Sequence, residues 1–411
     1  MNTLHCRSCG EALHLVFADL GVSPLSNSYL EADELNAMEP FYPLTVRVCD
    51  HCWLVQLPQV VTPRQIFSDY AYFSSYSDSW LKHSETFAEM IVTRLGLGGE
   101  HRVVELASND GYLLQYFTQR GIPVLGVEPA ANVAAAAEQK GIPTIIKFFG
   151  VETAEAMVRA GLTADLLIGN NVLAHVPDLN DFIAGMKHIL KPGGVLTMEF
   201  PHLQHLLELN QFDTIYHEHF SYFSFIPVET AFRRHGLEIF DVEEIQAHGG
   251  SLRIYGKHIE NEYWPISPRV EDLRARERIK GYDRAETYAR FTQQMEETKA
   301  GLLSFLIETK RAGKRVVGYG APAKGNTLLN YCGIRTDFLE YTVDRSEHKQ
   351  GLFLPGSHIP IHAPEHIRET MPDYVLILPW NLREEIMEQM ADIRAWGGRF
   401  VVPIPKIEIL T

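Results

Sequence analysis

The sequence predicts an α/β protein with two doubly wound sheets, preceded by a small metal-binding module. Short apolar runs alternate with helical stretches in the middle of the chain, and a second such set follows a charged helical segment. Four of the five cysteines form two close pairs near the start. Alternating strands and helices imply a mainly parallel sheet covered by helices. With 411 residues, 45% of them hydrophobic, the chain is long enough for two or three cores.

The first predicted domain, residues 1–65, is irregular and contains both cysteine pairs. Two Cys-x-x-Cys motifs supply four candidate metal ligands: Cys6, Cys9, Cys49 and Cys52. Four thiolates close a tetrahedral zinc shell with no open position, so we expect a structural zinc ion. A loop-rich insertion, residues 19–43, has to fit between the motifs. The alternative is that these are unrelated buried thiols, as we expect for the fifth cysteine, Cys332.

The second predicted domain, residues 66–260, carries the first set of alternating elements. Strands are expected at residues 102–107, 124–127, 165–169 and 195–200, and helices at 80–95, 112–119, 131–140 and 181–190.

A ligand site is expected where the first of these strands ends, in the turn at residues 107–111. The three-glycine phosphate fingerprint is missing there, which favours a cofactor without phosphate. Glu128, about twenty residues further on, can accept both hydrogen bonds of a ribose diol. Alternatively, Glu128 only caps the helix that follows it. The small and amide side chains of residues 167–173 would let a cofactor approach the backbone closely.

The third predicted domain, residues 261–411, begins with a charged helical linker and continues with a second strand set at 315–319, 338–344, 374–378 and 399–403. A strand, a glycine-rich turn and a helix start follow one another over residues 316–327. Backbone donors, the helix dipole and Lys324 could hold a diphosphate here, although the turn could also serve tight packing alone.

The segment Tyr216-His217-Glu218-His219 concentrates a phenol, a carboxylate and two imidazoles. Imidazole can take a proton near neutral pH, and a neighbouring donor can stabilise the oxyanion of an enolate. We therefore predict a catalytic loop that removes a proton from a carbon next to a ketone. A metal pair formed by His217 and His219 is the alternative, but the order His-Glu-x-x-His is absent. If the segment is extended, His217 points away from His219.

Several motifs together carry a family resemblance. They are Glu-Leu-Ala-Ser-Asn-Asp-Gly-Tyr-Leu-Leu at 105–114, Asn-Asn-Val-Leu-Ala-His-Val-Pro at 170–177, Lys-Pro-Gly-Gly at 191–194, Tyr-His-Glu-His-Phe-Ser-Tyr-Phe-Ser at 216–224, the cysteine pairs, and the loop at 349–360. With them the whole chain resembles the three-domain sugar C-methyltransferases, which use S-adenosylmethionine (SAM) to methylate a carbon of a nucleotide-linked ketosugar. The resemblance implies a class I SAM-methyltransferase sheet in the middle domain and a Rossmann-like C-terminal domain.

The resemblance also assigns residues to roles. The general base falls on His219, with Tyr216, Glu218 and His175 completing the catalytic set; alternatively, His175 is an ordinary histidine at a strand end. The candidate cofactor-binding residues are Glu105, Ala107, Asn109, Gly111, Tyr112, Glu128, Pro129, Asn170, Asn171 and Val172. The candidate substrate-binding residues are Tyr70, Tyr72, Ser74, Tyr222, Lys324, Asn326, Asp344 and Lys349. The first three belong to a segment, 70–76, that resembles the family's cover over cofactor and substrate, although half of it could be core.

The predicted reaction is SAM-dependent methylation of a ring carbon, C-3, next to the ketone of a nucleoside-diphosphate 4-keto-6-deoxy sugar. A SAM-dependent O- or N-methyltransferase is one alternative, and it would not need the loop at 216–219. An NAD-linked oxidoreductase is disfavoured by the glycine-poor turn. A zinc-bearing nucleic-acid or protein interaction module is suggested by the cysteine pairs alone. The net charge of −15 argues against nucleic acid.

The sequence gives no indication of a membrane partner. Residues 1–13 lack a basic stretch followed by an apolar core, and no run approaches the roughly 20 apolar residues of a membrane span. We expect a cytoplasmic enzyme that is a monomer or a weak dimer.

Overall fold

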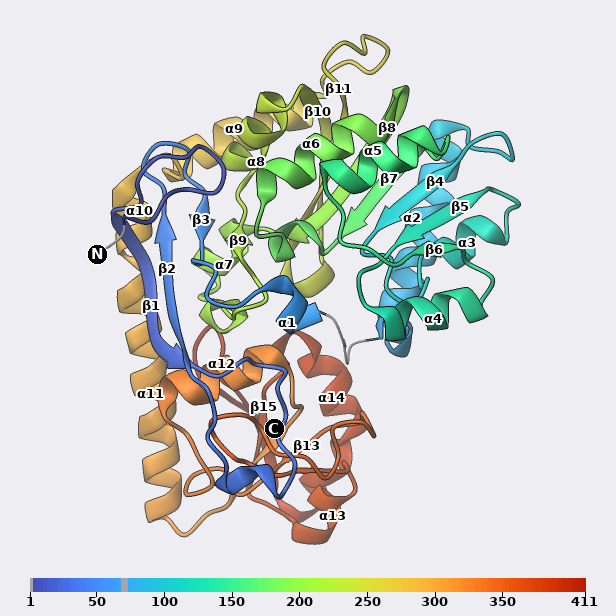
Figure 1. Cartoon of the computed structure of the whole chain (residues 1–411). Coiled ribbons are helices and arrows are strands. Elements are labelled where there is room, and N and C mark those ends of the chain that lie inside the picture. Colours follow the sequence, from blue (N-terminus) through green and yellow to red (C-terminus); the bar gives the residue numbers. More distant parts are fainter. Residues whose placement is uncertain (1–2, 68–72) are drawn as a thin grey trace. The chain divides into compact units, whose positions relative to one another are not determined.

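The computed structural model describes residues 3–67 and 73–411, and the chain forms two compact units. Unit 1 consists of residues 1–14, 48–202 and 220–285, and unit 2 of residues 15–47, 203–219 and 286–411. Figure 1 shows the course of the chain through both. No helix in the described part of the chain has the length and apolar character needed to cross a membrane.

Unit 1 is built around a seven-stranded sheet with the order β10-β11-β8-β7-β4-β5-β6 (Figure 1). Its strands are β4 (Val103–Leu106), β5 (Val124–Val127), β6 (Thr144–Ile145), β7 (Ala164–Asn170), β8 (Leu190–Pro201), β10 (Leu237–Ile245) and β11 (Ser251–His258). Strand β11 runs antiparallel to both of its neighbours, and the other pairs are parallel. The predicted doubly wound sheet is confirmed, with one antiparallel strand inserted between β8 and β10.

Helices cover both faces of this sheet because successive strand residues point to opposite sides. On one face, Val103 packs in a cluster with Phe87 and Ile91 of α2 (Asp78–Leu95). On the other, Val104 shares a cluster with Met157 and Phe182. The first face also carries α3 (Leu114–Thr118) and part of α4 (Ala131–Gln139), and the second α5 (Val151–Arg159), α6 (Leu179–Ile189), α8 (Phe225–Arg234) and α9 (Pro268–Lys280).

The ends of α2 follow from its flanking residues. The Ser77 hydroxyl accepts a hydrogen bond from the Trp80 N–H at the N-terminus, and Gly96 ends the helix in the left-handed conformation with φ 64°. Serine is favoured just before a helix because its hydroxyl accepts a hydrogen bond from a backbone N–H that has no partner within the helix. Glycine is favoured just after a helix because, without a Cβ, it adopts the left-handed conformation without strain. The helix therefore begins immediately after the segment predicted to cover the ligands.

Unit 2 contains a six-stranded sheet with the order β14-β13-β12-β15-β16-β17. Its strands are β12 (Val316–Tyr319), β13 (Thr342–Val343), β14 (Ile361–His362), β15 (Tyr374–Ile377), β16 (Arg399–Val402) and β17 (Glu408–Leu410), and β17 alone is antiparallel to its neighbour. The chain moves from β12 to one side through β13 and β14, then returns to the other side through β15. This reversal is the Rossmann strand order, and sheets of this kind bind ligands outside the carboxyl ends of the strands beside the reversal, here β12 and β15.

The insertion at residues 19–43 is loop-rich, as expected: its middle part, residues 24–41, has a short 3-10 helix at Glu34–Asn36 as its one regular element. The longer segment between the cysteine pairs also contains β1 (Leu15–Ser23) and β2 (Tyr42–Val48), and residues 15–47 of it belong to unit 2. Phe17 stacks on Phe291 of the long helix α11 (Phe291–Arg311), with 4.7 Å between ring centroids. Leu30 forms a β-bridge with Phe353. The insertion thus packs on the C-terminal α/β elements.

Candidate active site

The four cysteine thiols converge in unit 1. Their sulfur atoms all lie within 4.8 Å of one another, with 3.6 Å between Cys6 and Cys52 and 3.5 Å between Cys9 and Cys49. A tetrahedral zinc ion with Zn–S bonds of about 2.3 Å needs sulfur atoms roughly 3.8 Å apart, so the cluster fits zinc. A hydrogen bond from Cys52 lowers the pKa of the Cys6 thiol to about 4. The Gln56 amide also donates to Cys6 Sγ over 3.1 Å.

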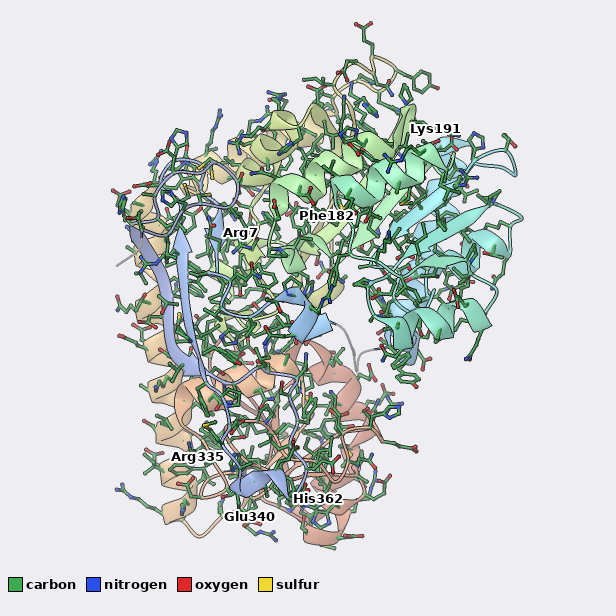
Figure 2. All side chains as sticks on the ribbon, in the orientation of Figure 1. Arg7, Phe182, Lys191, Arg335, Glu340 and His362 are labelled. Carbon is green, nitrogen blue, oxygen red and sulfur yellow. The ribbon has the colours of Figure 1, made fainter. Side chains whose placement is uncertain are left out.

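The loop between Cys6 and Cys9 is tied to the middle domain. Arg7, labelled in Figure 2, donates to the carbonyl oxygens of Pro177, at 3.2 Å, and Leu57. The Asn180 amide donates to the carbonyls of Arg7 and Ser8 at 3.0 and 3.1 Å. Strand β3 (Val55–Gln56) pairs antiparallel with β9 (Ser221–Tyr222). The zinc module therefore supports the loop that follows His175.

The turn after β4 has an unusual backbone. Ala107 and Asn109 adopt positive φ values of 55° and 49°, and Gly111 has a φ of 75°. Glycine adopts this φ without strain, and a Cβ atom at Gly111 would in addition lie 2.3 Å from Ile142 Cδ1, so glycine is favoured there. Non-glycine residues rarely adopt this conformation, and such residues concentrate at ligand sites. The turn is the strained strand end at which the sequence predicts cofactor binding.

The segment before α2 is hydrogen-bonded to this turn. The backbone N–H of Ser74 donates to Asn109 Oδ1 over 2.9 Å, and that of Ser75 donates to Asp110 Oδ2 over 3.3 Å. Ser74 is buried and contacts the turn through its backbone. Tyr70 and Tyr72, also predicted to bind substrate, lie outside the described residues.

Two buried carboxyl groups lie beside the turn. Glu128 Oε2 accepts from the Asn109 N–H at 3.0 Å, and Oε1 accepts from the Ala130 N–H at 2.9 Å. The second bond is the helix-capping contact considered as an alternative, yet each oxygen keeps a lone pair for a ribose hydroxyl. Burial raises the pKa of Glu128. Burial raises the pKa of Glu105 still further, and a hydrogen bond with Tyr112 opposes that shift.

The carboxyl end of β7 supplies the remaining cofactor candidates. Asn170 ends the strand, is 5% exposed, and has no hydrogen-bond partner for its amide among residues 3–67 and 73–411. Asn171 has a positive φ of 53°, and its N–H donates to the Glu199 carbonyl at 2.8 Å. Val172 is buried, and His175 ends a short 3-10 helix, Leu173–His175. Pro129 continues from β5 towards α4.

The predicted catalytic loop lies in unit 2 and is not extended. The His219 N–H donates to the Tyr216 carbonyl at 2.9 Å, which closes a turn, and the rings of these residues lie 4.1 Å apart. His219 Nδ1 lies 2.9 Å from the Thr214 carbonyl oxygen. Because a carbonyl only accepts, Nδ1 carries the proton and Nε2 is the basic nitrogen. The segment forms a turn, so the extended geometry under which His217 would point away from His219 does not apply.

The other two residues of the loop are buried. Glu218 Oε1 accepts a hydrogen bond from Asn27 Nδ2 over 2.5 Å. His217 contacts the Pro43 carbonyl through Nε2 at 3.1 Å, and burial lowers its pKa. Both partners come from the insertion between the cysteine pairs, so that insertion holds the loop.

A polar cluster lies at the carboxyl end of β12. The Ala321 carbonyl accepts from the Tyr29 hydroxyl at 2.6 Å and from Lys349 Nζ at 3.0 Å, while its N–H donates to Asp344 Oδ2 at 2.7 Å. Burial alone would lower the pKa of Lys349, but its contacts with Tyr29 and Asp344 raise it. Lys349 therefore keeps its positive charge in this cluster.

A second cluster lies at the start of α12 (Ala323–Cys332). Lys324 Nζ donates to Asn381 Oδ1 at 2.7 Å and lies 4.5 Å from the ring centroid of Trp380. The Trp380 indole donates to Asp213 Oδ2 at 2.7 Å. Burial lowers the pKa of Lys324, opposed by the charge of Asp213. Asn326, only 1% exposed, donates to the Ser26 carbonyl at 2.6 Å and fixes the insertion.

The structure thus gathers the site candidates in two groups. Unit 2 brings Tyr216, Glu218 and His219 together with Lys324, Asn326, Asp344 and Lys349. Unit 1 contains His175, Ser74, Tyr222 and all ten cofactor candidates, and Tyr222 lies in β9 beside the zinc module. Sequence reasoning missed four residues of unit 2: Asn27, Tyr29, Asp213 and Trp380. Their contacts span long stretches of chain, and no local pattern marks them.

The strand order of unit 1, the strained turn and the buried acids fit the methyltransferase domain whose model matches this part of the chain, which makes the protein a SAM-dependent methyltransferase. Family models match a zinc binding domain at residues 6–67, a methyltransferase domain at 80–242 and a C-methyltransferase C-terminal domain at 246–405. C-methyltransferase NovU of Streptomyces niveus is 37% identical over 406 residues, which cover 99% of this chain and 96% of NovU. The chain therefore belongs to the C-methyltransferase family with these three domains.

Other relatives match shorter parts of the chain. The ubiquinone biosynthesis O-methyltransferase of Rhodopseudomonas palustris is 32% identical over 24% of this chain and 38% of its own length. A solved SAM-dependent methyltransferase from Clostridium acetobutylicum covers 43% of this chain with 13% identity and a TM-score of 0.35.

Proposed function

We propose that this C-methyltransferase methylates C-3 of a nucleoside-diphosphate 4-keto-6-deoxy sugar. The single observation that carries the proposal is the His219 tautomer, which directs a basic nitrogen away from the Thr214 carbonyl. Carbon methylation needs such a base because a carbon next to a ketone reacts only after it has lost a proton. Methylation of oxygen or nitrogen does not require an enolate.

The loop residues divide the work of enolate formation. His219 Nε2 takes the proton from the ring carbon, and the Thr214 carbonyl stabilises the imidazolium through Nδ1–H. Tyr216 or His175 donates a hydrogen bond to the ketone oxygen as its charge develops. Glu218, held by Asn27, orients the loop or binds a hydroxyl of the sugar.

The cofactor would be held by the strained turn and the two strand ends beside it. Glu128 accepts from the ribose hydroxyls, and the backbone at Ala107, Asn109 and Gly111 permits close approach, as do Asn170, Asn171 and Val172. When bound, SAM supplies the electrophilic methyl group on a sulfonium ion. Alignment of that group with the enolate carbon supplies much of the rate.

The carboxyl ends of β12 and β15 in unit 2 are the proposed site for the nucleoside diphosphate. Lys349 and Lys324 supply positive charge, and the N-terminus of α12 adds backbone donors. Gly320, with φ 89°, lets the chain pass close to Pro379 at this point, where a Cβ atom would lie 2.5 Å from that ring. An anionic ligand is favoured here even though the whole chain carries a charge of −15.

Incubation with methyl-labelled SAM and a panel of dTDP-, CDP- and GDP-linked 4-keto-6-deoxy sugars tests this function. We expect label on one panel member, with an NMR methyl singlet from a quaternary ring carbon. The same reaction with His219→Asn is the matched control and should give no labelled sugar. A methyl group on oxygen or nitrogen, or no transfer to any member, would reject the proposal.

Three further expectations complete the proposal. The domain boundaries 1–65, 66–260 and 261–411 stay a prediction, as do a cytoplasmic location and a monomer or weak dimer. Limited proteolysis tests the domain boundaries, and analytical ultracentrifugation tests the oligomeric state.

A further inference from the structure

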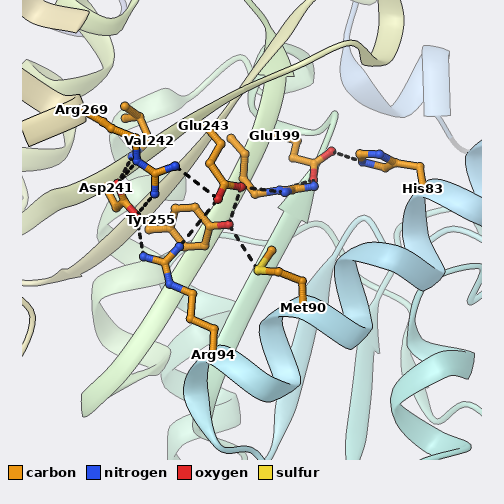
Figure 3. Close-up of polar contacts among 10 residues, drawn as sticks. His83, Met90, Arg94, Glu199, Asp241, Val242, Glu243, Tyr255 and Arg269 are labelled. Carbon is orange, nitrogen blue, oxygen red and sulfur yellow. Dashed lines mark hydrogen bonds and ion pairs between the residues drawn. The ribbon is translucent and has the colours of Figure 1, made fainter. Parts of the chain in front are cut away.

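A partly buried ionic cluster lies between α2 and the antiparallel edge of the unit 1 sheet (Figure 3). Its members come from two helices and three strands: His83, Arg94, Glu199, Asp241, Glu243, Arg253, Tyr255 and Arg269. Arg253 pairs with Glu199 at 2.6 Å and with Glu243 at 2.9 Å. Arg94 and Arg269 pair with Asp241 at 2.6 and 2.5 Å. The contacts join α2 and α9 to β8, β10 and β11.

The charges of this cluster balance without His83. Three carboxylates (Glu199, Asp241, Glu243) face three guanidinium groups (Arg94, Arg253, Arg269). Buried charges are tolerated when each is paired in this way. The imidazole is therefore not needed as a cation to neutralise the cluster.

His83 contacts the cluster through one nitrogen only. Its Nε2 lies 2.9 Å from Glu199 Oε2, and the Glu199 side chain is 2% exposed. Burial would favour the protonated acid, but the hydrogen bond with His83 and the charge of Arg253 lower the pKa of Glu199. An ionised carboxylate only accepts, so Nε2 carries the proton and Nδ1 carries the lone pair. Among residues 3–67 and 73–411, Nδ1 has no hydrogen-bond partner.

The position of His83 relates it to the cofactor candidates. Glu199 is in register with Asn170 on β7, so both side chains point to the same face, and the Asn170 amide is buried with no partner in the described chain. The His83 ring stacks on Trp80, with centroids 4.9 Å apart, and Trp80 stacks on Tyr112 at 5.8 Å. His83 and Asn170 therefore offer free polar atoms at the carboxyl edge of the sheet, where ligands of doubly wound folds bind.

We propose that His83 is a ligand-binding residue whose Nδ1 accepts a hydrogen bond from a protonated donor of a ligand bound at the carboxyl edge of the unit 1 sheet, with Asn170 as the second contact. Glu199 fixes the tautomer, and Trp80 fixes the plane of the ring. Two sources can supply such a donor: the ammonium group of the cofactor's amino-acid part and a hydroxyl group of the methyl acceptor. If the donor is a hydroxyl group of the methyl acceptor, the inference rests on the proposed function. If it is the ammonium group of the cofactor, the inference rests only on SAM dependence.

Two variants test this role without removing the packing of the ring. His83→Phe keeps the stack on Trp80 and loses both nitrogen atoms. His83→Gln keeps a donor for Glu199 and an acceptor for the ligand. A matched control is His366→Phe in unit 2, where His366 contacts Glu369 at 2.8 Å in a similar pair that is exposed. Thermal unfolding of all three variants reports whether the fold is retained.

The expected result is a loss of ligand affinity in His83→Phe that His83→Gln partly restores. One lost hydrogen bond corresponds to a roughly three- to tenfold rise in a dissociation constant. If the cofactor is the source, calorimetry with S-adenosylhomocysteine and no sugar will show this rise. If the acceptor is the source, that affinity is unchanged and the KM for the sugar rises instead.

Wild-type values for S-adenosylhomocysteine affinity and sugar KM in a folded His83→Phe variant would overturn the proposal. Equal losses of ligand affinity in His83→Phe and His83→Gln would also overturn it. Glutamine keeps a hydrogen-bond acceptor for the ligand and phenylalanine does not, so equal losses would mean that His83 has a structural role only. The cofactor measurement needs no sugar, so a loss of S-adenosylhomocysteine affinity in His83→Phe would support the proposal even if the panel of ketosugars yields no product.

Discussion

Asp213 in unit 2 gives a quantitative test of the electrostatics around the proposed nucleotide site. Its side chain is fully buried, Oδ2 accepts from the Trp380 indole, and Oδ1 has no partner among the described residues. Burial raises its pKa from an ordinary value of 3.8 to about 6, although Lys324 and Trp380 oppose the shift. Asp213→Asn keeps an acceptor for Trp380 and removes the titration.

The sign of the effect follows from proton binding. Between pH 4 and 6 the folded state holds a proton on Asp213 that the unfolded state has released, so the free energy of unfolding falls as pH rises through this window. A shift of about two pKa units corresponds to about 3 kcal/mol. In Asp213→Asn this fall is absent. The variant should therefore gain about 3 kcal/mol relative to the wild type between pH 4 and pH 7.

Urea unfolding of both proteins at intervals from pH 4 to pH 7.5, followed by circular dichroism, measures this difference. Asp337→Asn, an exposed carboxylate of unit 2, is the matched control and should follow the wild type. If the stability difference between Asp213→Asn and the wild type does not change with pH, Asp213 is not held protonated by burial, and our reading of this cluster is wrong.

Three further substitutions separate the zinc module, the cofactor site and the catalytic loop. Cys49→Ser should release zinc, measured by atomic absorption, and should lower the stability of the protein. If the variant is folded, zinc-free and of normal stability but cannot methylate, the metal has a catalytic role instead. Glu128→Gln should weaken S-adenosylhomocysteine binding about tenfold in calorimetry. The control Glu138→Gln, at an exposed position, should bind like the wild type. If Glu128→Gln also binds like the wild type, Glu128 serves only as a helix cap. Asn27→Leu should lower kcat about tenfold because Glu218 loses a charged hydrogen bond, and it should leave the affinity for S-adenosylhomocysteine unchanged. An unchanged kcat would show that Asn27 is not a positioning residue.

The parts of the fold that could be predicted from the sequence are those with uniform apolar strands. Strands β4, β5 and β7 are buried on both faces, so they appear as continuous apolar runs. Strands β10 and β11 lacked that signal because Asp241, Glu243 and Arg253 point into the sheet–helix interface and form the ionic cluster. Charged residues at buried positions hide a strand from a hydrophobic pattern.

The candidate site was predictable where its residues are close in sequence. The cysteine pairs, the glycine-poor turn and the loop at 216–219 each carry their chemistry in a few consecutive residues. The supports of that loop could not be predicted, because Asn27 reaches Glu218 across 191 residues of chain. Trp380 likewise meets Asp213 across 167 residues. Such contacts depend on the folded insertion and have no period or spacing in the sequence.

Proton removal by His219 is tested most directly by measuring the turnover of His219→Asn with a ketosugar that the wild type accepts. Asparagine keeps a donor towards the Thr214 carbonyl but has no basic nitrogen, so methyl transfer should be abolished. Calorimetry should give an unchanged affinity for S-adenosylhomocysteine, and His366→Asn in the same unit should retain activity. A folded His219→Asn enzyme that keeps more than a few per cent of wild-type turnover would contradict the account.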